Sequence, residues 1–172
     1  MSILVMKYVV MYQSKSGNTE KIAEEIYQNL PEWDTDIYDI DKGGEIPLAE
    51  VYFIGFGVQR GTCSMEIINL FEKIKGGKIA LFATCGSCPT DHYKKQIESA
   101  VQVWLPEDSD YLGMFLCQGK IEKEMRQSML NQGEISGYAD SIRQLLDESE
   151  SHPDEEDFAA AAAFAKKIAE QI

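Results

Sequence analysis

Short apolar runs alternate along the chain with segments whose apolar residues recur at helical spacing, and this alternation constrains the fold most. Residues 51–56, VYFIGF, are continuously apolar, as expected of a strand that is covered on both faces. Residues 22–30 instead place their apolar side chains on one face of a helix. Strands are predicted at residues 7–12, 35–40, 51–56, 78–83 and 111–117. Strands that alternate with helices indicate an α/β fold: a doubly wound, five-stranded parallel sheet with helices on both faces.

The length of the chain favours one domain. A chain of 172 residues with 44% hydrophobic content is large enough to bury a sizeable core, so we expect a single domain over residues 1–172. Further helical faces are predicted at residues 67–74, 93–104 and 153–168. The segment 120–152 is polar and longer than one crossover needs. Its apolar pattern predicts a helix between Ser136 and Leu146.

The balance of charge excludes several kinds of partner. Acidic residues number 29 against 16 basic ones, and the net charge is -13. Phosphate backbones and anionic lipids repel such a chain, so we expect neither nucleic acid nor a membrane as its partner. No apolar stretch approaches the ~20 residues needed to cross a bilayer, which favours a cytoplasmic location. The acidity serves either solubility or docking to a basic face on a partner, and charge alone does not choose between them.

The turn after the first predicted strand, SKSGNT, leads directly into the first predicted helix. Its hydroxyls, its amide and the free N–H groups of the first helical turn are suited to surround one phosphate, which the positive end of the helix also favours. The spacing is neither that of a P-loop nor that of the dinucleotide fingerprint. The alternative is an ordinary helix cap by Ser16 or Asn18. The candidate phosphate ligands are Ser14, Lys15, Ser16, Gly17, Asn18 and Thr19.

This turn resembles the FMN phosphate loop of flavodoxins, S/T-x-S/T-G-N-T, and the order of elements resembles that family over nearly the whole chain. A second likeness is the sequence His152-Pro153-Asp154 before the last predicted helix. The resemblance implies a flavodoxin-like fold with strand order 2-1-3-4-5 and FMN as the cofactor. It also implies that the flavin ring lies between the loops that follow the third and fourth strands.

The loop after the third predicted strand is the first place where the resemblance puts the ring. A peptide at the position of Gly61 turns over in flavodoxins to offer its carbonyl to the ring, although the glycines here could also serve only a tight turn. Arg60 departs from the family, which often has an aromatic or apolar residue there. A guanidinium beside the ring would raise the reduction potential of the flavin; a solvated Arg60 would not. The candidate residues are Gly57, Val58, Gln59, Arg60, Gly61 and Thr62.

The loop after the fourth predicted strand is the second such place. Its short polar residues are suited to hydrogen-bond the edge of the ring, and Tyr93 either stacks on the ring or packs in the first turn of the next helix. The candidate residues are Thr84, Cys85, Gly86, Ser87 and Tyr93. The pair Cys85-x-x-Cys88 also fits dithiol chemistry or, with the other two cysteines, a metal or cluster site. We expect no metal, and reduced thiols at Cys63, Cys85, Cys88 and Cys117.

The resemblance implies an electron carrier: a monomer that shuttles electrons through FMN to a larger redox enzyme and has no catalytic residues of its own. The alternative is a small FMN-dependent reductase that oxidises NAD(P)H and reduces a quinone or a related acceptor. A third interpretation is a module that has kept the fold and lost the cofactor. Whether the protein is itself an enzyme stays open at the level of sequence.

Overall fold

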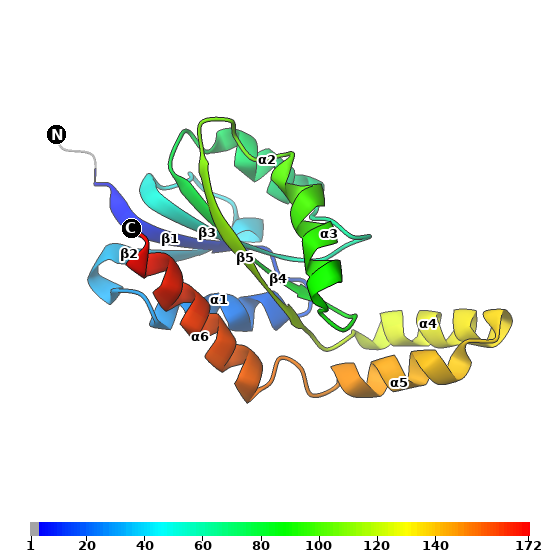
Figure 1. The fold of residues 1–172 in the computed structure, drawn as a ribbon. Helices are drawn as coiled ribbons and strands as arrows, with labels where there is room; N and C mark the ends of the chain where they lie inside the picture. The colour runs from blue at the N-terminus through cyan, green and yellow to red at the C-terminus, as the bar shows by residue number, and fades with distance from the viewer. Residues whose placement is uncertain (1–3) are drawn as a thin grey trace.

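The computed structural model describes residues 4–172, whose five strands form one parallel sheet (Figure 1). The strands are β1 (Met6–Tyr12), β2 (Thr35–Asp39), β3 (Ala49–Gly57), β4 (Lys78–Cys85) and β5 (Asp110–Gln118). Their order across the sheet is β2-β1-β3-β4-β5, and every neighbouring pair is parallel. The predicted α/β class and strand order are therefore confirmed.

Three of the six α-helices in the described part of the chain connect strands, and the other three follow β5. The six are α1 (Asn18–Gln28), α2 (Met65–Lys73), α3 (Asp91–Gln102), α4 (Lys123–Ser136), α5 (Ala139–Ser149) and α6 (Glu155–Glu170). Short 3-10 turns form η1 (Glu32–Asp34) and η2 (Ile40–Lys42). The connection from β2 to β3 contains η2 and no α-helix. Within residues 4–172, no helix combines the length and the apolar character needed to span a membrane.

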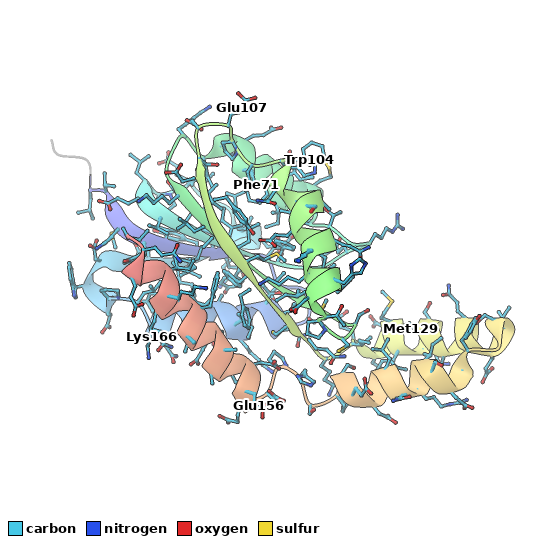
Figure 2. The ribbon with its side chains drawn as sticks, in the orientation of Figure 1. Phe71, Trp104, Glu107, Met129, Glu156 and Lys166 are labelled. Atoms are coloured by element: carbon cyan, nitrogen blue, oxygen red, sulfur yellow. The ribbon has the colours of Figure 1, made fainter. Side chains whose placement is uncertain are left out.

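Both faces of the sheet are covered, each by its own pair of helices. Tyr8 and Val10 of β1 belong to the core that α1 and α6 cover. Val9 and Met11 point to the opposite face, into the core beneath α2 and α3, where Phe71 is fully buried (Figure 2). Alternate residues of a strand point to opposite faces, and both faces are apolar here. This explains why the strands appear in the sequence as continuous apolar runs.

One close contact inside the sheet depends on a missing side chain. Gly55 lies in β3 directly opposite Phe82 of β4 in the parallel pairing. A Cβ atom at Gly55 would lie 2.0 Å from Cε2 of Phe82, whose ring is fully buried. The ring of Phe82 therefore occupies the space above Gly55, and the packing of β3 against β4 requires glycine there.

A pair of helices, α4 and α5, extends away from the sheet between β5 and α6 and forms an antiparallel hairpin (Figure 1). The sequence predicted one helix between Ser136 and Leu146. The structure has α5 slightly later in the chain, and α4 in addition. Helix α4 escaped prediction because its amphipathic pattern is weak: Ile135 is 88% exposed, and its other apolar residues are spread among polar ones.

The two ends of the hairpin are joined through one carboxylate. Glu150, just after α5, lies 2.9 Å from Nζ of Lys120, which precedes α4. The other oxygen of Glu150 lies 2.6 Å from Nη1 of Arg126 in α4. These ion pairs bring the start and the end of the hairpin together beside the sheet.

Candidate cofactor site

A cavity of about 280 Å³ opens where the parallel strands end. It lies between the β1–α1 loop and the segments that follow β3, β4 and β5. Open parallel sheets bind their ligands at this edge. Predicted site residues that line the cavity are Lys15, Ser16, Asn18, Thr19, Gly57, Val58, Gln59, Thr84, Cys85, Gly86 and Ser87. Predicted site residues outside the lining are Ser14, Gly17, Arg60, Gly61, Thr62 and Tyr93.

The cavity also has walls that the sequence interpretation missed. They come from the end of β1, from the β5–α4 loop and from the helical hairpin. The additional lining residues are Gln13, Gly119, Lys120, Ile121, Glu122, Met125, Met129 and Leu145. The loop after β5 could have been expected here, because the ends of parallel strands meet at one edge. The hairpin residues could not be predicted in this way, because the polar sequence of residues 120–152 does not indicate that the segment lies beside the site.

Helix α1 begins without a side-chain cap. Its N-cap residue is Gly17, in the left-handed region with a φ of 91°, and no side chain accepts a hydrogen bond there. Ser14 Oγ instead accepts from the N–H of Gly17 at 3.1 Å, which shapes the loop before the helix. Helices α2, α3 and α6 are each capped by a side chain, whereas α4 and α5, like α1, are not. Neither Ser16 nor Asn18 caps α1, so the first-turn N–H groups are available to an anion.

Buried polar contacts hold the loops around this helix end. Asn18 Nδ2 donates to the carbonyl of Lys120 at 2.9 Å and so fastens the β5–α4 loop to α1. The hydroxyls of Thr19 and Thr84 lie 2.9 Å apart in the interior, which links α1 to the end of β4. The side chains of Asn18 and Thr19 therefore contact the loop after β5 and the end of β4, respectively.

Two glutamines brace the same edge of the sheet. Ser64 Oγ donates to Gln13 Oε1 at 2.6 Å, and Gln13 Nε2 donates to Asp41 Oδ1 at 3.0 Å. Gln118 Nε2 donates to the carbonyl of Gly86 at 2.8 Å. The cavity walls are therefore cross-linked by hydrogen bonds that hold them without a ligand.

The loop after β3 forms a tight turn at the rim of the cavity. Gln59 and Thr62 exchange backbone hydrogen bonds of 2.8 and 3.1 Å. Between them Arg60 and Gly61 have φ values of 53° and 80°, the combination of a type I′ turn. The side chain of Arg60 is exposed. Thr62 Oγ1 is buried and has no hydrogen-bond partner within residues 4–172.

Tyr93 lies outside the lining of the cavity and packs against the core. It lies in the first turn of α3, where its N–H donates to Thr90 Oγ1 at 3.1 Å. Its ring packs, partly buried, against the core beneath α2 and α3. Within the described chain, the lining of the cavity contains no aromatic residue.

Basic side chains gather next to the phosphate loop. A second hollow of about 850 Å³ shares Ser16 and Asn18 with the first cavity. The basic residues of its lining are Lys21 of α1, Lys120 of the β5–α4 loop, and Lys123 and Arg126 of α4, and the acidic ones are Glu122, Glu124 and Glu150. The hydrogen bond from Lys120 lowers the pKa of the Glu150 carboxyl, so that group is negative and offsets part of this positive charge. Four basic residues against three acidic ones make this hollow less acidic than the chain as a whole, whose net charge is -13.

All four cysteines are free thiols, and they differ sharply in exposure. Cys88 is exposed, whereas Cys63, Cys85 and Cys117 are buried. Burial raises the pKa of the Cys85 thiol to about 12, and it also raises the pKa of Cys117. The Cys85 thiol donates to the carbonyl of Ser87 at 3.3 Å. A protonated thiol is a poor nucleophile and a poor metal ligand, which argues against dithiol chemistry at Cys85.

We therefore expect one rapidly reacting thiol in the native protein, Cys88, and four after unfolding without reductant. Titration with a chromogenic disulfide at neutral pH measures both numbers. The variant Cys88→Ser should have no rapidly reacting thiol in the native state and three thiols after unfolding. Fewer than four thiols in the unfolded chain would instead reveal a disulfide and contradict the assignment.

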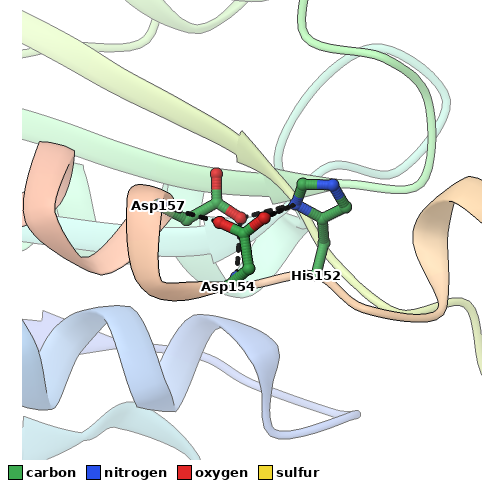
Figure 3. A group of neighbouring side chains, drawn as sticks. All are labelled: His152, Asp154 and Asp157. Atoms are coloured by element: carbon green, nitrogen blue, oxygen red, sulfur yellow. Dashed lines mark hydrogen bonds and ion pairs between the residues drawn. The ribbon is translucent and has the colours of Figure 1, made fainter.

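A second group of polar side chains surrounds the start of α6 (Figure 3). Asp154 Oδ1 accepts from the N–H of Asp157, while Asp157 Oδ2 accepts from the N–H of Asp154. His152 Nδ1 lies 2.6 Å from the same Asp157 oxygen. His152 is partly buried and Asp157 is its acidic partner, a contact that the sequence did not indicate. The group is a capping box with a histidine added, and capping α6 accounts for its carboxylates.

Together the doubly wound sheet, the uncapped α1 and the cavity at the strand ends define a flavodoxin-like α/β protein. The chain belongs to the flavodoxin domain family, whose sequence profile it matches over residues 9–166. It is similar to the flavodoxin-like domain-containing protein BilS of Clostridioides difficile (strain CD3). The two are 36% identical over 170 residues, which is 95% of this chain and 96% of BilS.

Solved structures share the fold. A flavodoxin from Streptococcus pneumonia TIGR4 has a TM-score of 0.59 and 14% identity, with 98% of this chain and all 100% of that one covered. A flavoprotein from Lactobacillus acidophilus NCFM, solved in complex with FMN, has a TM-score of 0.50 and 20% identity. That comparison covers 66% of this chain and 93% of the other. At these identities the likeness is one of fold alone.

Proposed function

We propose that this protein binds FMN non-covalently and carries electrons to a larger redox enzyme. The observation that carries the proposal is the uncapped N-terminus of α1, which adjoins the cavity at the end of β1. The phosphate of FMN would accept from the first-turn N–H groups and from the hydroxyls of Ser16 and Thr19. Lys21 and Lys120 would add favourable charge from the neighbouring hollow.

The rest of the cavity suits the remainder of FMN. Its lining combines the hydroxyl and amide groups of Ser16, Asn18 and Thr19 with the apolar side chains of Val58, Ile121, Met125, Met129 and Leu145. A lining with both polar and apolar parts suits a phosphate joined to a flat aromatic ring. Bound FMN would supply a redox couple that accepts and releases one or two electrons.

The acidity of the chain supports an electron carrier. The net charge of -13 favours encounter with a basic face on a partner. We propose a monomer that docks through acidic surface near the exposed edge of the ring.

The test is to purify the protein, add FMN and follow binding by absorbance and by calorimetry. The complex is then reduced without oxygen, and in a separate sample NADH or NADPH is added. We expect saturable uptake of FMN and no oxidation of either nucleotide. A reduced complex should pass electrons to a basic acceptor such as cytochrome c, and more slowly as salt rises.

The outcomes separate the three interpretations. Rapid bleaching of the bound flavin by NADH or NADPH would replace the carrier with the NAD(P)H-dependent reductase. Failure to take up FMN would overturn both and leave a module that has lost its cofactor.

A further inference from the structure

We propose that the α4–α5 hairpin covers the flavin ring with Met125, Met129 and Leu145, in place of the aromatic side chain expected in the loop after β4. This inference rests on the proposed binding of FMN. It assigns a ligand contact to a part of the chain that lies outside both loops flanking the ring.

The continuity of the cavity places the hairpin at the ring. One hollow contains the phosphate-loop residues Ser16 and Thr19 and also the hairpin residues Met125, Met129 and Leu145. A phosphate at the start of α1 leaves the rest of an elongated ligand to lie along that hollow. The apolar lining of the hollow is at the hairpin and at Val58 and Ile121, so the aromatic end of the ligand belongs there.

The two methionines are placed to act as one surface. Met125 and Met129 are four residues apart in α4, which puts them on the same face of the helix. Leu145 of α5 completes the wall from the other arm of the hairpin. Met125 is 57% exposed and lines the cavity, so a ligand there can reach its thioether.

The chemistry of the wall fits a flat aromatic ligand. Thioethers are polarisable and make favourable contacts with aromatic rings, and unbranched methionine adapts to the shape of its partner. No aromatic residue of residues 4–172 lines the cavity, and Tyr93 is committed to the core. The hairpin methionines are therefore the side chains available to lie against the ring.

The hairpin is held in this position by named contacts. Arg126 pairs with Glu150 at 2.6 Å and its Nη1 also lies 3.4 Å from the carbonyl of Leu146, which ties α4 to α5. Glu150 in turn pairs with Lys120, which follows β5. The wall is thus anchored to the same loop that Asn18 fastens to the phosphate site.

The first test places an indole in the wall. Indole quenches the fluorescence of an excited flavin when the two rings are in contact, because it transfers an electron to the flavin. We expect FMN bound to Met129→Trp to lose most of the emission that it has on the unaltered protein. The matched control is Ile135→Trp, on the same helix but outside the cavity lining, where emission should not change.

The second test removes the wall. The double variant Met125→Ala/Met129→Ala should bind FMN about tenfold more weakly, since both thioether–ring contacts are lost. Circular dichroism checks that it is folded, and Ile135→Ala is the control. Normal FMN affinity in the double variant, together with unquenched FMN on Met129→Trp, would overturn the role of the hairpin alone. An unaltered protein that does not bind FMN would overturn the proposed function as well.

Discussion

The variant Ser16→Asp should bind FMN about 100-fold more weakly than the unaltered protein, yet melt at a higher temperature when FMN is absent. The new carboxylate would lie where the phosphate is proposed to bind, and repulsion of about 3 kcal/mol corresponds to roughly two powers of ten in affinity. The same carboxylate would interact favourably with the uncapped start of α1, by about 0.3–1 kcal/mol. That gain amounts to about 1–3 °C in melting temperature for a chain of this size.

Weaker FMN binding together with a higher melting temperature could not result from simple damage to the fold, which would lower both the affinity and the melting temperature. Ser128→Asp, at an exposed position of α4 outside the cavity lining, is the matched control and should change neither quantity. Calorimetric titration with FMN and thermal unfolding of the FMN-free protein measure the two effects. Unchanged FMN affinity in Ser16→Asp would show that the phosphate binds elsewhere.

The variant Gly55→Ala should lower stability by about 3 kcal/mol, because the added methyl group would collide with the ring of Phe82. For a domain of this size that corresponds to about 6–12 °C in melting temperature. The collision is in the middle of the sheet, where neither β3 nor β4 can move away without disturbing the core on both sides. Urea unfolding of the FMN-free protein measures the loss.

Gly57→Ala provides a control in the same strand. A Cβ at Gly57 would meet Thr19 Oγ1 at 3.9 Å, an ordinary contact, so the FMN-free variant should be nearly as stable as the unaltered protein. Equal losses at Gly55 and Gly57 would mean that glycine is needed in β3 for some reason other than the ring of Phe82.

The sheet was predictable because strands that are buried on both faces consist of continuous apolar residues, and such runs are easily recognised in the sequence. The apolar run of β3 and the helical spacing of α1 leave few alternatives to a parallel α/β fold. Helix α4 was not predictable in the same way. It packs on one neighbouring helix and lines a cavity, so it needs few apolar residues, and these do not form a strong periodic stripe.

The lining residues of the cavity were predictable where they lie near the ends of strands. Those that come from the α4–α5 hairpin were not predictable. Asn18 and Thr84 each follow or end a strand, and the topology alone brings them to one edge. Met129 and Leu145 reach the same cavity only because the hairpin projects over that edge. The sequence allowed Tyr93 either a ring contact or a core contact, and the structure places it partly buried against the core beneath α2 and α3, outside the cavity lining.

The shared carboxylate of Glu150 has a consequence for how the chain can be altered. Because Lys120 and Glu150 are in contact, residues 121–149 leave the sheet and return to it at nearly the same point. A segment whose two ends already meet adds little loop-closure entropy to the folding of the rest. Changes of length within residues 121–149 should therefore have little effect on the folding of the sheet.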